Sequence, residues 1–413
     1  MKRHLLLSLA LALVSLAALA QTPADTTLLP TREDGRQIST YAIAHDMLLQ
    51  VEPECAYHPG MTRRQLRKWQ GSVSDAMREI MSMPRWLEEK FAEKDTAPVR
   101  VSSEPRDGYT LEKWEFYPFK GAVSTFLVMI PEGAGASDPR PAMLCIPGSG
   151  CPKELLACEP LPQTPDVQRT FNSKSAMALD YVREGYIAVC VDNAATGEAA
   201  DHEIEDNDDV TPSRLLLEMG WSWLGYTSYL DNIVLQWMKT RPEMRRDRIV
   251  VSGFSLGTEP MMVLGALDKD IYAFVYNDFL CQTQERALVM THLRKDGTRP
   301  FPNSIRHLIP NYWRYFNFPD VVASFAPRPI IFTEGGLDQS FDLVRDAYRT
   351  AGAPEAASCH HYAKYADPKD RAGIYPLPGG LDAATYFHYA NVDTRNHYFK
   401  HEIVLPWLRD VLK

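Results

Sequence analysis

The 413-residue sequence lacks several patterns that would place it in common functional classes. It has no C-x-x-C pair and no histidine-rich segment, so we expect no zinc site. It has no cluster of lysine and arginine and a formal net charge of −9, which argues against a nucleic-acid partner. No apolar run reaches the ~20 residues that span a bilayer, so we expect no stable membrane insertion. Neither a metal nor another cofactor is predicted.

The N-terminus has the pattern of a secretory signal peptide. Lys2 and Arg3 precede an uncharged apolar run over residues 5–19, and Ala18-Leu19-Ala20 is a small-x-small cleavage site. Position 21 is glutamine rather than cysteine, so the usual lipid-attachment residue is absent. We predict cleavage after Ala20 and a periplasmic or secreted mature protein; an uncleaved membrane anchor is the alternative.

Three regions differ in their residue patterns. Residues 1–20 are the predicted signal peptide. Residues 21–100 hold a polar arm and then a helical extension, in which apolar residues such as Leu66, Trp69 and Val73 recur at helical spacing. Residues 101–413 begin with two β-rich runs and continue with apolar strands alternating with helices. This order predicts an α/β domain with a mostly parallel central sheet and helices on both faces.

A strand, a tight turn and a helix follow one another at residues 249–267. A β-branched run leads into Gly253-Phe254-Ser255-Leu256-Gly257, and a helix-compatible stretch follows. With these flanks, the G-x-S-x-G pattern is typical of a nucleophile elbow, in which small residues permit the sharp turn and the serine hydroxyl is exposed at its apex. Ser255 is therefore the predicted nucleophile.

A nucleophilic serine needs a histidine base, and the base needs an acid that orients it. After such an elbow the chain order is serine, acid, histidine. That order excludes the histidines that precede the candidate acids. His360 and His361 fall in a predicted strand over 358–365, so the remaining candidates are His388, His397 and His401. We favour His397 because it lies in a loop-like stretch before the last predicted helix. His401 would lie one turn into that helix, and His388 lies in an aromatic run.

Three carboxylates are candidates for the acid. Glu334-Gly335-Gly336-Leu337-Asp338 follows a predicted strand over 329–333, and its glycines permit a turn that points Asp338 over the sheet edge. Asp338 is therefore favoured. Glu334 lies nearer the strand and is an alternative. Asp278, after the predicted strand 273–276, is the third.

The oxyanion of the intermediate requires two backbone N–H donors. Leu256 follows the nucleophile and supplies the first. The second is expected from the loop Pro147-Gly148-Ser149-Gly150-Cys151, which follows the third predicted strand of the domain. Gly150 and Cys151 are the candidate donors.

Other residues are candidates for substrate binding. Asp278 is one of them. Glu259 opens the helix after the elbow, where the helix dipole alone would also favour a carboxylate. Arg286 is placed to recognise a substrate carboxylate, although a surface salt bridge would also explain it.

Two insertions also have more than one interpretation. The acidic segment 198–209 is a solvated or a calcium-binding loop. The aromatic-rich segment 292–320 is a lid or wall of the substrate cleft, or simple apolar packing.

Taken together, these motifs make the chain resemble exported bacterial α/β-hydrolases of the dienelactone-hydrolase and acetyl-xylan-esterase-like group, over about residues 55–413. The residues that carry the resemblance are His58-Pro59-Gly60-Met61, Trp69-Gln70, Gly225-Tyr226, Tyr229-Leu230, Gly253 to Pro260, Tyr276 to Phe279, Glu334 to Asp338, and Asn396 to Phe399. The resemblance implies an α/β-hydrolase fold and serine-dependent hydrolysis of an ester.

The hypothesis is an exported serine esterase with Ser255, His397 and Asp338 as its triad. Its substrate is a small-molecule or saccharide ester, and the reaction passes through an acyl-enzyme. A peptidase of the prolyl-oligopeptidase type is an alternative, although the chain has no long β-rich N-terminal propeller. A catalytically inactive binding protein that keeps the fold is the other alternative.

Overall fold

The computed structural model describes residues 32–413 except 96, 162–173, 202–207 and 295. The predicted signal peptide, the start of the arm and the middle of the acidic segment lie outside the described residues. Among the described helices, none is both long and apolar enough to cross a bilayer.

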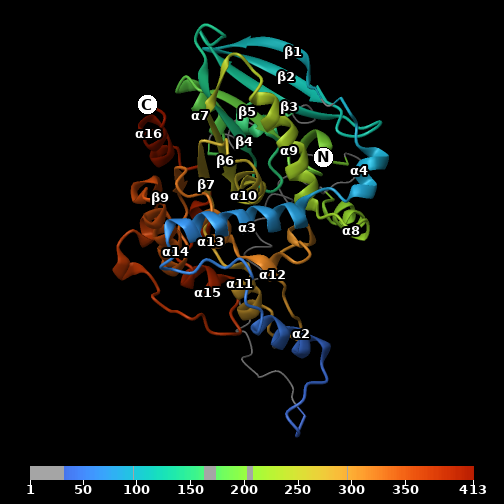
Figure 1. The fold of residues 1–413 in the computed structure, drawn as a ribbon, viewed down its shortest axis with the longest axis vertical. Helices are drawn as coiled ribbons and strands as arrows, with labels where there is room; N and C mark the ends of the chain where they lie inside the picture. The colour runs from blue at the N-terminus through green and yellow to red at the C-terminus, as the bar shows by residue number, and fades with distance from the viewer. Residues whose placement is uncertain (1–31, 96, 162–173, 202–207, 295) are drawn as a thin grey trace, which may run out of the picture.

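A single mixed sheet of nine strands forms the centre of the described chain (Figure 1). Its order is β1-β2-β3-β5-β4-β6-β7-β8-β9. The strands are β1 (Val99–Arg106), β2 (Tyr109–Phe116), β3 (Ser124–Pro131), β4 (Arg140–Ile146), β5 (Ile187–Val191), β6 (Met244–Phe254), β7 (Ala273–Asn277), β8 (Ile330–Phe332) and β9 (Ala357–Cys359). The antiparallel strands β1 to β3 come first, and β5, β4 and β6 to β9 are parallel. The predicted, mostly parallel sheet is confirmed.

Fourteen α-helices are described around this sheet. They are α2 (Thr40–Leu49), α3 (Arg63–Met81), α4 (Arg85–Phe91), α5 (Lys153–Ala157), α7 (Met177–Arg183), α8 (Val210–Glu218), α9 (Trp223–Met238), α10 (Thr258–Leu267), α11 (Thr283–Met290), α12 (Tyr312–Tyr315), α13 (Phe318–Ala323), α14 (Asp338–Ala351), α15 (Ala383–Tyr389) and α16 (His401–Val411).

Side chains alternate between the two faces of the sheet, because successive residues of a strand point in opposite directions. In β4, Leu144 joins a core with α3, α9, α10, α13 and α14. Its neighbours Met143 and Cys145 join the opposite core, which includes α5, α7 and α16. Helices therefore cover both faces, as predicted, and the helical extension at α3 shares the larger core.

Two predictions about strands differ from the structure. β1 was not predicted, because its residues are mostly exposed and its sequence VRVSSEPR has no buried apolar side. The strand predicted over 358–365 ends at Cys359, and 3-10 turns follow it. His360 and His361 therefore lie in a loop, at the end of the sheet where the other loops after parallel strands also gather.

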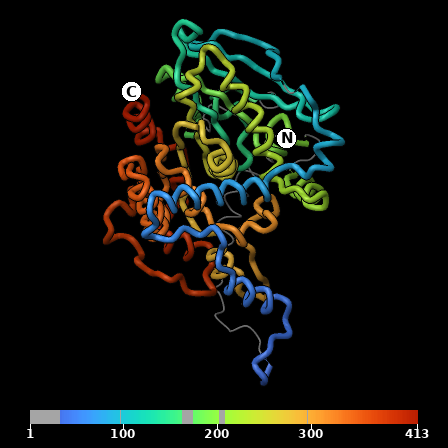
Figure 2. Tube along the Cα trace, in the orientation of Figure 1, coloured from blue at the N-terminus to red at the C-terminus, as the bar shows by residue number. Residues whose placement is uncertain are grey.

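The first described helix, α2, lies beside α11 at one end of the molecule (Figure 2). Two hydrogen bonds hold the end of α2 and the chain just after it, because the side-chain amide of Gln284 in α11 donates at 3.0 Å to the carbonyl oxygens of both Leu48 and Val51. The arm thus reaches the cavity described below rather than extending away from the domain.

Candidate active site

The turn at Ser255 has the geometry of a nucleophile elbow. Ser255 has φ +51°, a value that a non-glycine residue rarely adopts and that marks backbone held under strain. A Cβ added to Gly253 would lie 2.5 Å from the carbonyl oxygen of Gly257, and one added to Gly257 would lie 2.2 Å from that of Ile146. Both glycines are needed because backbone segments cross here without room for a side chain.

A cavity of about 1080 Å³ opens over this turn. Ser255, Leu256 and His397 all line it. Leu256 lies in the 3-10 turn that leads into α10, and the first N–H groups of a helix have no acceptor within the helix. The Leu256 N–H is therefore suited to donate to a negatively charged oxygen, and its role as the first oxyanion donor stays a prediction.

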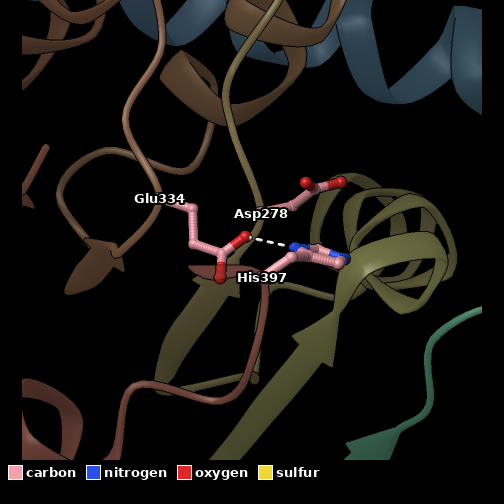
Figure 3. Close-up of side chains that lie close together, drawn as sticks. All are labelled: Asp278, Glu334 and His397. Carbon is pink, nitrogen blue, oxygen red and sulfur yellow. Dashed lines mark hydrogen bonds and ion pairs between the residues drawn. The ribbon is translucent and has the colours of Figure 1, made fainter. Parts of the chain in front are cut away.

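His397 lies in the loop before α16, and its imidazole is held from two sides. Its Nδ1 lies 2.5 Å from Oε2 of Glu334, the hydrogen bond drawn in Figure 3. Its ring stacks on that of Phe254, the neighbour of Ser255, with 4.9 Å between ring centroids. Because Nδ1 faces the carboxylate, Nε2 is the nitrogen left to exchange a proton with a serine.

Glu334 follows β8 directly and is fully buried. Its Oε1 accepts hydrogen bonds from Nζ of Lys400 at 2.6 Å and from the backbone N–H of Tyr398 at 3.2 Å. Its Oε2 accepts from the hydroxyl of Tyr362 at 2.8 Å as well as from His397. Burial acts to raise the pKa of Glu334, but the hydrogen bonds and charges of His397 and Lys400 outweigh burial and hold the pKa below its ordinary value.

The pKa of His397 moves in the opposite direction. Burial acts to lower it, but the hydrogen bond to Glu334 and the negative charge of that carboxylate raise the pKa above its ordinary value. The charge of Asp278 acts in the same direction. An imidazolium at this position is therefore stabilised, which is what a base needs when it has taken a proton from serine.

The structure corrects the predicted acid. Asp338 does not contact His397: its Oδ1 accepts from Nη1 of Arg371 at 2.7 Å and lies 3.1 Å from Nε2 of His361. The prediction failed because Asp338 is the first residue of α14 and its side chain is 41% exposed. Glu334, the alternative that the sequence left open, is the carboxylate on His397.

Asp278, the third candidate acid, lies near the same imidazole. Its ligand atom, that of Glu334 and that of His397 all lie within 4.8 Å of one another (Figure 3). Burial raises the pKa of Asp278 to about 7, although the charge of His397 opposes this. These three side chains lie close enough together to be ligands of one metal ion. However, the direct 2.5 Å contact of Nδ1 with Oε2 is shorter than the roughly 3 Å that separates two ligands of one zinc ion.

The other two candidate histidines lie elsewhere. His401 is exposed, and its Nδ1 is 4.0 Å from Oδ2 of Asp180. Nδ1 of His388 lies 3.4 Å from the hydroxyl oxygen of Tyr365. Neither lines the cavity that contains Ser255.

The loop over 147–151 comes close to Ser255 at Gly148. A Cβ added there would lie 3.2 Å from Cβ of Ser255, whereas one added to Gly150 would meet nothing within 4 Å. The N–H of Cys151 donates to the carbonyl oxygen of Gly148 at 3.2 Å, so this predicted donor is already engaged in a turn. The approach to Ser255 is therefore made by Gly148 rather than by Gly150 or Cys151.

A hydrogen-bonded chain links this loop to the helix after the elbow. Nη2 of Arg306 donates to Oγ of Ser149 at 2.7 Å, and Nη1 forms an ion pair with Asp209. Nε of Arg306 donates to Nε2 of His307 at 3.3 Å. An arginine only donates, so Nδ1 of His307 carries the proton and donates to Oε1 of Glu259 at 2.7 Å. Glu259, a predicted substrate-binding residue, thus lines the cavity already paired.

The segment 292–320 contributes to a wall of the cavity, and its residues Tyr312, Tyr315 and Phe316 also pack in the main hydrophobic core, so both interpretations describe part of it. Pro302 to Trp313 contribute most of this wall, including His307 and Arg306. The sequence indicated neither residue, because no motif marks Arg306 and the order serine, acid, histidine excludes His307 as the base. The arm adds a second wall through Leu48, Val51 and neighbouring residues.

The calcium-loop interpretation of the acidic segment receives no support from the part of it that is described. Glu198 forms ion pairs with Lys113 and, at 2.7 Å, with the buried Lys153. Arg306 pairs with Asp209 at the other end. The carboxylates at both ends are thus bound to cationic side chains.

Comparisons with known proteins agree with this geometry. The model of the Abhydrolase family matches residues 21–410. A crystal structure from Bacteroides fragilis, named a putative acetyl xylan esterase, is 56% identical with a TM-score of 0.86. The match covers 92% of this chain and 97% of that chain. Methylesterase BT1017 is 16% identical with a TM-score of 0.50, covering 79% of this chain and 64% of that chain, and shows a similar fold only. No curated protein sequence matches significantly.

Proposed function

Because the chain belongs to the Abhydrolase family, we propose that it hydrolyses carboxylic esters with Ser255 as nucleophile, His397 as base and Glu334 as acid. The observation that carries the proposal is a strained serine and a histidine that line one cavity, with the buried carboxylate of Glu334 hydrogen-bonded to that histidine. The 56% identical structure that is named a putative acetyl xylan esterase supports an ester of a carbohydrate as the substrate.

The proposed reaction has two steps. Oγ of Ser255 attacks the ester carbonyl while Nε2 of His397 takes the hydroxyl proton, and His397 then gives this proton to the departing sugar hydroxyl. Water, deprotonated by His397, then attacks the acyl-serine, and His397 returns this proton to Oγ of Ser255 as the carboxylic acid is released. Glu334 holds the imidazole by Nδ1 and stabilises its positive charge, and Leu256 N–H donates to the oxyanion.

A panel of esters tests this function directly. The full chain should hydrolyse p-nitrophenyl acetate and acetylated xylo-oligosaccharides, and Ser255→Ala should abolish both activities. A fluorophosphonate probe should label the wild type at Ser255 and leave Ser255→Ala unlabelled. A wild type that neither hydrolyses any ester nor reacts with the probe would instead support an inactive binding protein.

Export through the segment 1–20 is part of the same proposal. It rests on the basic start, the apolar run and the small-x-small site before Gln21. N-terminal sequencing of the protein recovered from its native host should begin at Gln21. Recovery of the protein with Met1 intact in the membrane fraction would favour the uncleaved anchor.

A further inference from the structure

Arg286 lies in α11 and lines the same cavity as Ser255 and His397. Its surroundings differ from those of the other arginines on that cavity. Arg306 forms an ion pair with Asp209, and Arg314 forms one with Glu54. Within the described ranges, no carboxylate lies within ion-pair distance of Arg286.

Three aromatic rings surround the guanidinium instead. Its Cζ lies 5.4 Å from the ring centroid of Tyr386, 5.5 Å from that of Phe387 and 5.8 Å from that of Phe279. One hydrogen bond is present, from Nη2 to the carbonyl oxygen of Pro302 at 3.5 Å, the long limit for such a contact. The Nε is buried and has no hydrogen-bond partner.

This arrangement leaves most of the hydrogen-bonding capacity of Arg286 unused. A guanidinium has five N–H donors in a planar fork that fits a carboxylate with two parallel hydrogen bonds. The rings stabilise the cation through cation–π contacts and hold its plane, but they accept no conventional hydrogen bond. They also exclude water from one side, which strengthens an added ion pair.

The carboxylates around the cavity would oppose an anionic substrate unless a cation offsets them. At a formal net charge of −9, the protein as a whole repels anions, and Glu52, Glu54, Glu259 and Asp278 also line the cavity. Among the described arginines of this cavity, Arg286 is the one whose charge is not already balanced by a carboxylate. A substrate carboxylate would supply that balance.

We propose that Arg286 binds a carboxylate carried by the ester substrate, so that the preferred substrate is an acidic ester rather than a neutral one. This inference rests on the proposed esterase function of the same cavity. The carboxylate has two chemical sources: a uronic acid on the saccharide side of the ester, or a dicarboxylic acyl group such as a hemisuccinate. Phe279 and Phe387 line the cavity beside the guanidinium and offer apolar faces to a sugar ring.

The experiment compares three esters on wild type and variants. They are a neutral acetylated xylo-oligosaccharide, the same compound with a uronic acid branch, and a hemisuccinate ester of the neutral sugar. The readout is the ratio of kcat/KM for each charged ester to that for the neutral ester, so that a general loss of activity cancels. Arg286→Gln should lower at least one ratio by about 10- to 100-fold, and Arg286→Lys, which keeps the charge without the fork, by less.

Arg248→Gln is the matched control. Arg248 also lies over an aromatic ring, that of Tyr272 at 4.5 Å, and also has a buried Nε without a partner. It does not line the cavity and is paired with Asp247 at 2.8 Å. Both ratios should stay at their wild-type values in Arg248→Gln. Circular dichroism and urea unfolding check that each variant is folded.

Titration calorimetry with small unesterified ligands separates this inference from the proposed function. The charged probes are D-glucuronate and succinate, the neutral probe is D-xylose, and all are titrated into Ser255→Ala with and without Arg286→Gln. Arg286→Gln should weaken the binding of at least one charged probe and leave the binding of D-xylose unchanged. Hydrolysis without charge preference, together with equal binding in both backgrounds, would overturn the role of Arg286 and leave the esterase assignment intact. Charge-selective binding without hydrolysis of any ester would overturn the esterase assignment and leave Arg286 as an anion-binding residue.

Discussion

Lys400 places its Nζ 2.6 Å from Oε1 of Glu334, the carboxylate whose other oxygen meets His397. Both side chains are buried, so the ion pair has little competition from water. The ammonium favours the ionised carboxylate, and the ionised carboxylate in turn favours the protonated imidazole. The order of charges Lys400, Glu334, His397 therefore links the start of α16 to the base of the proposed triad.

Replacing Glu334 should separate its role from that of Asp338, the acid that the sequence favoured. Glu334→Gln keeps the shape but removes the charge that holds Nδ1–H and stabilises the imidazolium. We expect kcat to fall on the order of 10³-fold or more, with a small effect on KM. Steady-state kinetics on a neutral acetyl ester measures this.

Asp338→Asn is the matched control, because it neutralises the carboxylate on His361 and Arg371 at the start of the next helix. Its kcat should stay within a few-fold of the wild type. A large loss in Asp338→Asn together with a small loss in Glu334→Gln would return the acid role to Asp338.

Removal of the ammonium should destabilise the protein in a pH-dependent way. Lys400→Met leaves the ionised, buried Glu334 without its cationic partner, at a cost of about 3–5 kcal/mol near pH 7. The pKa of Glu334 is held below its ordinary value in the native protein, so this stabilisation is present above the unfolded pKa and is lost as the pH falls through the folded pKa. The deficit measured by urea unfolding should therefore hold from pH 7 down to the ordinary glutamate pKa of about 4.3 and shrink below it. A deficit independent of pH would mean that Lys400 contributes packing alone.

Asp278 should shift the pH at which activity appears. The base works as the neutral imidazole, so kcat/KM rises with pH through the pKa of His397, which Glu334 and Asp278 both raise. Asp278→Asn removes one of these charges, and the rising limb should move to lower pH by about half a unit to one unit. Burial raises the pKa of Asp278 itself to about 7. Asp278 is therefore mostly ionised only above about pH 7, and there its replacement should have the largest effect on the protonation of His397. A profile measured from pH 5 to 9 that moves upward or stays in place contradicts this account.

Gly257, the second glycine of the elbow, should tolerate no side chain. Gly257→Ala would place a Cβ 2.2 Å from the carbonyl oxygen of Ile146, so backbone must move, at a cost of about 1–3 kcal/mol or more, and activity should fall with it. Gly71→Ala is the control, because Gly71 lies within α3 and an added Cβ meets nothing within 4 Å. There we expect a gain of about 0.5–1 kcal/mol, since alanine favours a helix. Urea unfolding of both variants measures the difference.

The sequence predicted those parts of the site that depend on local patterns. Ser255 lies between two glycines and between a strand and a helix, all within a dozen residues. His397 lies in the loop before the last helix, and chain order excluded the earlier histidines. Both reach the cavity over which the elbow turns, although their catalytic roles remain predictions.

What the sequence did not predict depends on contacts between distant segments. Asp338 and Glu334 both follow the same strand, and a glycine turn between them fits either choice. Hydrogen bonds from Lys400 and Tyr362 hold the Glu334 carboxylate in its buried position beside His397, and no motif marks those two residues. The role of Arg286 was left open for the same reason, because whether an arginine has a carboxylate partner is a property of the folded chain.

Arg306 gives the last prediction, because it joins the loop beside Ser255 to the helix after the elbow. If its hydrogen bond to Oγ of Ser149 holds that loop in place, Arg306→Met and Ser149→Ala should each lower kcat by about 10-fold and change KM little. Because both substitutions break the same 2.7 Å contact, the double variant should be no worse than the more damaging single variant.

A double-mutant cycle in kcat therefore tests the link rather than the residues alone. Arg306→Lys should retain part of the activity, since an ammonium replaces one donor but cannot reach Ser149, His307 and Asp209 together as the guanidinium does. Additive losses in the double variant would show that Arg306 and Ser149 act independently. In that case the loop is held instead by the buried contact of Asn193 Nδ2 with the carbonyl oxygen of Pro147 at 2.7 Å, and Asn193→Ala becomes the variant expected to lower kcat.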